Sequence, residues 1–243
     1  MALTALTIFL AFLVGVGSYY IARTAVEGRR LTAGELSRED FLEDDAEENR
    51  HLLNYMISGL AMVIGSMLTF SLVRPLGWTD YYSLLIDAAI LVFIATGIAL
   101  SWVDFELKLL PSKMIYTGGG ATLALLVAAA AVSGNWVLLL PMAMGGMLYF
   151  LFYFLIWFWK PGAFGFGDVR LSFFIGATLA FLSPSSAFVG FAAAWILALV
   201  GIGIGAAFGM IGRKTQIAFG PWMVLGAVVG LFWGAPIVNL LTF

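Results

Sequence analysis

The sequence predicts an all-α polytopic membrane protein with about eight membrane-spanning helices. Of its 243 residues, 62% are hydrophobic and only 11% are charged, and the mean hydropathy is +1.02. A soluble domain of this length could not bury so much apolar surface. Each of eight apolar runs is close to the ~20 residues needed to cross a hydrocarbon core of ~30 Å. The runs are residues 3–22, 53–73, 81–103, 114–133, 136–159, 169–182, 187–211 and 219–241.

The segments between the runs suggest how the chain is divided. The first run lacks a basic start and is long enough to span, which favours a helix over a cleaved signal peptide. Residues 1–76 are expected to form a two-helix region around an acidic cytoplasmic loop, 23–52, and residues 77–243 a six-helix core. The loop fits a solvated acidic segment, with docking of a basic partner as the alternative.

The sixth run is the shortest of the eight. It is followed by Ser183-Pro184-Ser185-Ser186, which fits a turn because Pro removes a backbone donor and Ser can cap the next helix. In an alternative arrangement, runs six and seven merge or tilt differently.

The basic residues predict the orientation in the membrane. If the N-terminus is outside, eleven of the twelve Lys and Arg residues fall on the cytoplasmic side and only Arg74 falls outside. This is a strong positive-inside bias. Both termini are then outside, while loops 23–52, 104–113, 160–168 and 212–218 are inside. Asp104 and Asp168 consequently share the cytoplasmic face.

Several kinds of chemistry are excluded by composition. The absence of Cys removes disulfides, thiolate nucleophiles and Cys-ligated metals, and the single His51 makes a His-based metal site improbable. Glycine clusters such as Gly118-Gly119-Gly120 are explained by close helix packing, because no strand or P-loop lysine accompanies them. We therefore expect no metal, no other cofactor and no nucleic-acid partner.

Few acidic residues lie where they could perform chemistry in the membrane. Outside the acidic region 27–48, five remain: Asp80, Asp87, Asp104, Glu106 and Asp168. Asp80 lies at the outer boundary, where it is expected to be hydrated. Asp87 precedes Asp104 by seventeen residues, about 25 Å along a helix. It is interpreted as a buried polar contact between helices, with ion or substrate passage as the alternative.

Asp104 and Asp168 form the candidate pair. Asp104 ends the third run, and Asp168 follows two glycines in Gly165-Phe166-Gly167-Asp168, where the sixth run begins. Two carboxylates that meet in a low-dielectric pocket resist double ionisation, so one stays protonated while the other can accept a proton from water. An aspartic protease needs this arrangement to activate water and protonate a leaving amine.

Three stretches of the sequence resemble the bacterial type IV prepilin peptidase family, membrane aspartyl proteases of the GxGD type. They are Asp104 with Leu109-Leu110-Pro111, then Gly165-Phe166-Gly167-Asp168-Val169-Arg170-Leu171, and Phe219-Gly220-Pro221-Trp222. They occur in the family's order on one membrane side, within residues 81–243. The resemblance implies catalytic roles for Asp104 and Asp168. It implies roles in substrate binding or site shaping for Gly165, Gly167, Pro111, Phe219, Gly220 and Pro221.

The chain also departs from the family pattern. Ser112 stands where Asn or Asp usually follows the Pro. The paired Cys-x-x-Cys motifs of larger members, linked to zinc and to N-methylation, are missing, so methyltransferase activity is not expected. Signal peptide peptidases and presenilins share GxGD, but their Y-D and P-A-L motifs do not occur here, because Val103 precedes Asp104.

The resemblance implies an aspartic endopeptidase of the bacterial inner membrane. It would remove a short basic leader, commonly after Gly, from type IV prepilins or pseudopilins at the cytoplasmic face of the bilayer. Two alternatives stay open. One is a proton- or ion-coupled transporter that uses Asp87, Asp104 and Asp168, and the other is an inactive pilus-assembly factor. The sequence predicts no oligomeric state.

Overall fold

The computed structural model describes residues 81–108, 110–160, 165–208 and 218–241, together with Thr24. The predicted helices 3–22 and 53–73, the rest of the acidic loop and the boundary at residue 76 lie outside the described residues. In the described part, all regular structure is helical. The elements are α3 (Tyr81–Leu107), α4 (Ser112–Ser133), the short 3-10 helix η2 (Trp136–Leu138), α5 (Leu139–Trp159), α6 (Phe166–Leu182), α7 (Pro184–Ala207) and α8 (Gly220–Leu241).

The six α-helices correspond to the last six predicted runs, with shifted ends. α3 continues to Leu107, so Asp104 lies inside its last turn, and α6 begins at Phe166, so Asp168 lies inside its first turn. Both shifts have the same cause. Hydrophobicity marks where a chain enters the membrane, whereas a helix continues until its backbone groups find other partners. At the end of α3, for example, Lys108 adopts a positive φ of 49° and its N–H bonds to the carbonyl oxygen of Asp104 at 2.8 Å.

The turn between α6 and α7 is confirmed. Ser183 is extended, and its side chain accepts a hydrogen bond from the backbone N–H of Ser185 at 3.2 Å. Pro184 occupies the first position of α7, where a missing N–H costs nothing. The alternative in which the two runs merge is therefore wrong.

Four of the described helices are long and apolar enough to cross a membrane. They contain the stretches Tyr81–Phe105, Ser112–Ser133, Trp136–Trp159 and Pro184–Ala207. α8 contributes a shorter apolar stretch, Gly220–Gly234. α6 has 17 residues and is about 26 Å long, slightly less than a typical hydrocarbon core. These lengths and compositions are those of a membrane protein.

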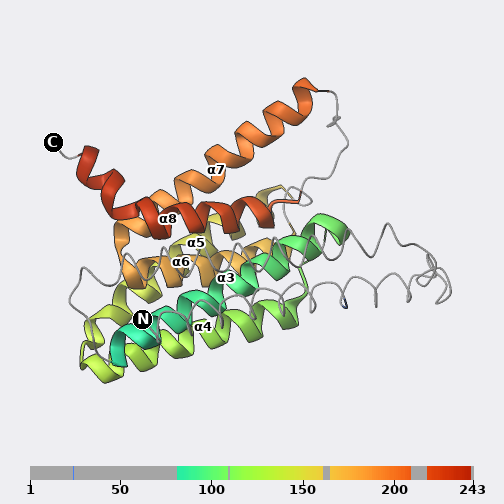
Figure 1. Ribbon diagram of the computed structural model, residues 1–243. Coiled ribbons are helices and arrows are strands. Elements are labelled where there is room, and N and C mark those ends of the chain that lie inside the picture. Colours follow the sequence, from blue (N-terminus) through green and yellow to red (C-terminus); the bar gives the residue numbers. More distant parts are fainter. Residues whose placement is uncertain (1–23, 25–80, 109, 161–164, 209–217, 242–243) are drawn as a thin grey trace, which may run out of the picture.

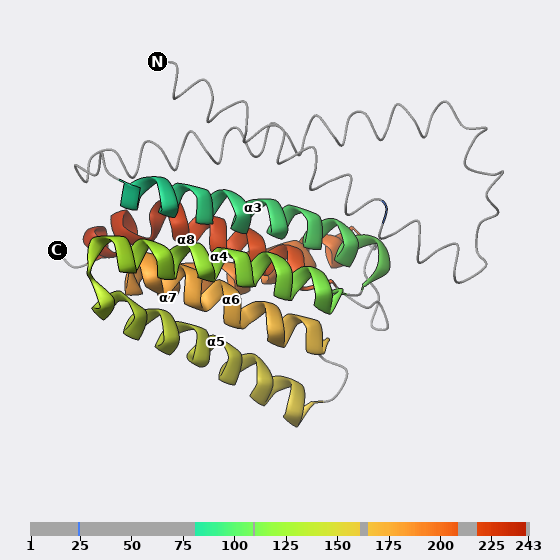
Figure 2. The same cartoon turned by 90° about the horizontal axis from the view of Figure 1, so that it is seen from below.

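The helices form a bundle with α6 in contact with most of its neighbours. α6 packs extensively on α5 and also touches α4, α7 and α8, while α3 packs on α4 and α8. Figures 1 and 2 show these helices running roughly side by side, and Figure 1 shows α7 leaning away from the others toward its C-terminal end. The ends of α3 and α5 and the starts of α4, α6 and α8 lie together at the right of Figure 1. This end of the bundle therefore carries both Asp104 and Asp168.

Glycines set the spacing between several helix pairs. A Cβ added to Gly176 of α6 would collide with the backbone oxygen of Gly145 on α5 and would lie 2.6 Å from the ring of Tyr149. A Cβ at Gly226 of α8 would lie 2.5 Å from the backbone nitrogen of Ala194 on α7. Small residues at such contacts let helix backbones approach closely, which drives association in a membrane. This confirms the packing explanation for the contacts at these positions.

Gly176→Ala should consequently destabilise the bundle by about 1–3 kcal/mol, because the added methyl group overpacks the α5–α6 contact. Gly203→Ala on α7 is the matched control, since a Cβ there meets nothing within 4 Å. The control should be neutral or stabilising by up to ~1 kcal/mol, as Ala is the better helix former. Thermal unfolding of both variants in detergent measures the difference. A Gly176→Ala protein that unfolds no lower than Gly203→Ala would contradict this account.

Candidate active site

Asp104 is oriented by the first residue of α8. Its side chain is only 5% exposed, and its Oδ2 accepts a hydrogen bond of 2.9 Å from the backbone N–H of Gly220. A Cβ at Gly220 would lie 2.7 Å from the same oxygen, so a larger residue could not approach without moving the carboxylate. The first N–H groups of a helix have no partner within it and carry partial positive charge. The start of α8 therefore favours a carboxylate at this point.

Asp168 is oriented by the start of its own helix. Its Oδ2 accepts a hydrogen bond of 3.0 Å from the N–H of Gly165, and its own N–H donates to the Gly165 carbonyl oxygen at 3.0 Å. The first bond is one of the two bonds of a capping box: the side chain of the third helical residue, Asp168, accepts from the backbone N–H of the N-cap residue, Gly165. Asp168 is 7% exposed. Its Oδ1 is buried and has no hydrogen-bond partner among the described residues.

The fold brings the two carboxyl groups together. Asp104 comes from α3 and Asp168 from α6, yet they are close enough for their charges to repel each other. Both side chains are buried, so water screens this repulsion weakly. The two acids, 64 positions apart, therefore lie near each other at one end of the bundle, and their joint catalytic role stays a prediction.

Gly167 and Pro111 allow the loop after α3 to lie against the start of α6. A Cβ at Gly167 would lie 2.6 Å from the Cβ of Leu110. Pro111 follows in an extended conformation as the N-cap of α4. Both residues predicted to shape the site therefore lie at the contact between the two segments that carry the acids.

A second link between these segments was not predicted from the sequence. Nη1 of Arg170 donates a hydrogen bond to the Ser112 hydroxyl oxygen. The guanidinium carbon also lies 4.6 Å from the centroid of the Phe166 ring and 5.8 Å from that of Tyr116, within cation–π range. Ser112, which departs from the family pattern, is thus a direct partner of the basic residue two positions after Asp168.

Aromatic rings from α5, from α7 and from the residue before α8 pack together near Asp168. Tyr153 of α5 is 1% exposed, and its ring centroid lies 6.1 Å from Trp195 of α7 and 5.9 Å from Phe219. Trp195 and Phe219 are themselves 5.2 Å apart. Tyr153 also lies near Asp168. Phe219 was a predicted site-shaping residue, and Pro221 is half-buried in the first turn of α8.

Sequence reasoning missed Tyr153 and Trp195. Both stand in apolar runs that are rich in aromatic residues, so a helical pattern alone gives them no special weight. The available signal was their polar ring atoms, since Tyr and Trp usually need a hydrogen-bond partner when they are buried.

Asp87 does not join the site. Asp87 lies on α3 with Asp104, seventeen residues and about 25 Å away. Its Oδ1 is buried without a hydrogen-bond partner in the part of the chain that the structure describes. Asp80 and the side chain of Glu106 lie outside the described residues. Within the described ranges, no three side chains of the types His, Cys, Asp and Glu gather.

This arrangement suits acid–base chemistry on a bound water. Each carboxylate is fixed by one glycine N–H, which holds its orientation without neutralising its charge. When such a buried pair holds one proton, one group can act as base and the other as acid. Within the pair, Oδ1 of Asp168 has no hydrogen-bond partner among the described residues and is a free acceptor.

Comparisons with known proteins add no relative from which a role could be transferred. No protein-family model, no curated protein and no solved structure matches the chain. The functional interpretation therefore depends on the geometry of the site and on the three sequence motifs.

Proposed function

We propose that the protein is a membrane-embedded aspartic endopeptidase. The observation that carries the proposal is the buried Asp104 and Asp168 pair, supplied by two helices and oriented by the N–H groups of Gly220 and Gly165. Buried carboxylates in membrane helices are costly, so a chain that keeps two of them together is expected to use them.

In the proposed reaction, the ionised carboxylate removes a proton from a water molecule, whose oxygen attacks the carbonyl carbon of the scissile peptide. The protonated carboxylate stabilises the tetrahedral intermediate by a hydrogen bond to its oxygen. The C–N bond then breaks as the amine nitrogen takes a proton from the pair, which returns to its singly protonated state. No other reactant is required.

The sequence motifs support a substrate of the prepilin class. The three stretches that resemble the prepilin peptidase family include the residues that surround the pair: Gly165, Gly167, Pro111, Phe219 and Gly220. The proposed reaction is removal of a short basic leader just before an apolar segment. Because the Cys-x-x-Cys motifs are missing, the product should leave without an added methyl group.

The full proposed topology has eight spans in a bacterial inner membrane, with both termini outside. Two of the spans, 3–22 and 53–73, are proposed from hydrophobicity alone. The distribution of Lys and Arg places the end of the bundle that carries Asp104 and Asp168 at the cytoplasm. A leader emerging into the cytoplasm would then reach the pair directly.

The transporter alternative fits the structure less well. It needs a path of acids through the membrane, but Asp87 and the Asp104–Asp168 pair are separated by about 25 Å along α3. An inactive assembly factor would gain nothing from the glycine contacts that orient both carboxylates.

Asp104→Asn and Asp168→Asn should each reduce cleavage by at least about a thousandfold, because an amide keeps the shape of the side chain but cannot exchange a proton. Asp87→Asn and Glu106→Gln are controls that should retain activity. The assay is co-expression with candidate prepilins followed by N-terminal mass measurement, which also reports any methyl group. Full turnover by either of the first two variants would exclude the aspartyl mechanism, and loss of cleavage in Asp87→Asn would contradict the view that only the pair is required.

Cleavage should show a bell-shaped dependence on pH. At low pH both carboxylates are protonated and no base remains, while at high pH both are ionised and no acid remains. The midpoints of the two limbs belong to the coupled pair and not to either residue. The measurement is kcat/KM of purified protein across pH on one substrate. A single sigmoidal rise that stays flat at high pH would mean that the proton donor is not part of this pair.

The orientation can be tested with single cysteines, since the chain has none of its own. Asn135 and Lys160 are both exposed and lie just beyond opposite ends of the η2–α5 segment. In intact cells, an impermeant thiol reagent should label Asn135→Cys and should label Lys160→Cys only after lysis. The reverse pattern would place the acidic pair outside.

A further inference from the structure

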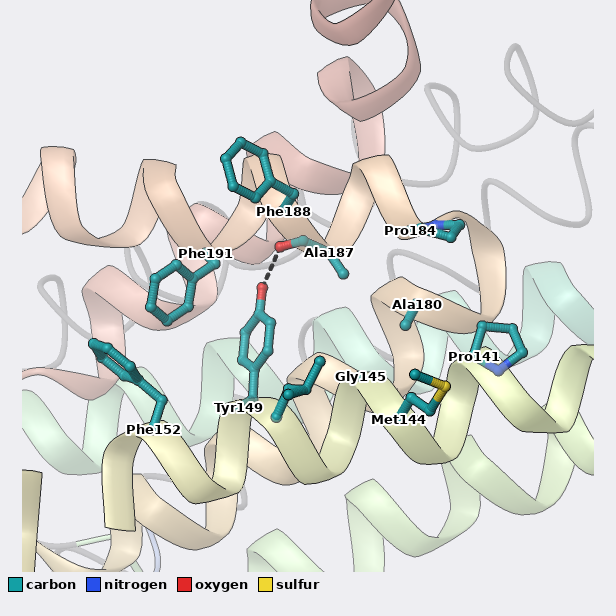
Figure 3. A pocket seen from close by; sticks show the side chains of 11 residues that line it. Pro141, Met144, Gly145, Tyr149, Phe152, Ala180, Pro184, Ala187, Phe188 and Phe191 are labelled. Carbon is teal, nitrogen blue, oxygen red and sulfur yellow. Dashed lines mark hydrogen bonds between the residues drawn. The ribbon is translucent and has the colours of Figure 1, made fainter. Parts of the chain in front are cut away.

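An apolar groove lies between α5, α6 and α7, away from the acidic pair. Its volume is about 520 Å³, and Figure 3 shows that it is lined by side chains such as Met144, Phe152, Ala180, Phe188 and Phe191. Tyr149 crosses it from α5 to α7 and donates its hydroxyl hydrogen to the Ala187 carbonyl oxygen. This hydroxyl is the one polar side-chain group in the lining, and it is already bonded. An apolar occupant would therefore leave no lining group unsatisfied.

The groove opens sideways, toward the position that lipid occupies around a membrane helix. Three residues on its edge are exposed: Met144 at 55%, Leu148 at 62% and Phe188 at 70%. α5 packs on α6 along its length but makes few contacts with α7. A hydrophobic segment could enter between α5 and α7 without leaving the bilayer.

Aromatic contacts connect the groove with the acidic pair. Phe152, in the lining, lies 5.8 Å from Trp195, measured between ring centroids. Trp195 lies 5.2 Å from Phe219, which directly precedes the glycine that binds Asp104. The lining of the groove runs along α5 from Phe152, which directly precedes Tyr153, to Pro141, eleven residues or about 16.5 Å away.

We propose that this groove binds the apolar helix that follows the scissile bond of the substrate. The inference rests on the proposed peptidase function and locates the surface that selects its substrate. In the proposed reaction the peptide is cut just before an apolar segment, and that segment would extend away from the pair, into the membrane. The groove begins at Phe152, whose ring contacts lead through Trp195 to Phe219 beside the pair, and it runs in that direction. The substrate helix would lie antiparallel to α5, with its first turn beside Tyr153.

This placement fixes a register. Leu148 lies five residues from Tyr153, about 7.5 Å, and Met144 lies nine residues away, about 13.5 Å. Because both helices rise by the same amount per residue, Leu148 should face roughly the fifth residue after the scissile bond. Met144 should face roughly the ninth.

Disulfide crosslinking tests the register directly. The probe is a protein with a short basic leader ending in Gly, an apolar segment of about twenty residues, and one cysteine at the fifth or ninth position of that segment. The probe is co-expressed with the protein carrying Asp168→Asn, so that the probe stays uncut. The same protein also carries either Leu148→Cys or Met144→Cys. Leu148→Cys should crosslink to the fifth position and Met144→Cys to the ninth, each at least about fivefold more than the reverse pairing. The control is Val127→Cys, at an exposed position of α4, which should crosslink to neither position of the probe.

Kinetics provide a second readout that does not need crosslinking. Phe188→Ala should raise KM roughly tenfold, corresponding to about 1.4 kcal/mol of lost apolar contact, and should leave kcat within about twofold. Val127→Ala should change neither constant.

The outcomes separate the two proposals. If the unsubstituted protein does not cut the probe, the peptidase proposal fails and the groove proposal falls with it. If cleavage is normal but neither groove cysteine crosslinks, only the groove proposal is overturned. Crosslinks between two copies of the chain, or a lipid that co-purifies while the probe never crosslinks, would likewise overturn it in favour of a dimer contact or a lipid site.

Discussion

The hydrogen bond from the Gly220 N–H to Asp104 is the interaction on which the site depends. It joins the last turn of α3 to the first turn of α8, across 116 positions in the sequence. In the membrane, a buried carboxylate without such a partner would be strongly disfavoured. The bond therefore fixes the orientation of one acid and the position at which α8 begins. Phe219, one residue earlier, is then held beside Tyr153 and Trp195.

The second acid is fixed by different means. Asp168 is held by Gly165 within its own helix start, so its orientation is local, but its position relative to Asp104 is not. That position follows from the contact of Gly167 with Leu110 and from the bond between Arg170 and Ser112, both of which join α6 to the segment after α3. One acid is thus oriented by a distant helix and the other by its own. Glycine is required at position 220, where a Cβ would lie 2.7 Å from the Asp104 oxygen, whereas a Cβ at Gly165 would make only an ordinary contact of 3.5 Å with Asp168.

The two ends of the bundle have different characters. The end with the acids contains buried charge, hydrogen bonds between distant segments and packed aromatic rings. Further along, an apolar groove lies between α5, α6 and the N-terminal part of α7, and several of its lining residues are exposed. A cut made at one end of an apolar segment would need both features: a polar site that controls protons, and an apolar surface that holds the rest of the segment within the bilayer.

The sequence by itself determined the helical class, six of the helices in the described part, the turn at Ser183 and the placement of Asp104 and Asp168 at one end. These properties follow from hydrophobic length and local turn chemistry, which act over a few residues. Only the tertiary structure decided the partner of each acid, the pairing of Ser112 with Arg170 and the roles of Tyr153 and Trp195. Helix ends also shifted, because α3 and α6 continue past the apolar runs that predicted them. The physical reason is that such contacts depend on how helices distant in sequence pack together, and apolar runs of similar composition do not encode which faces meet.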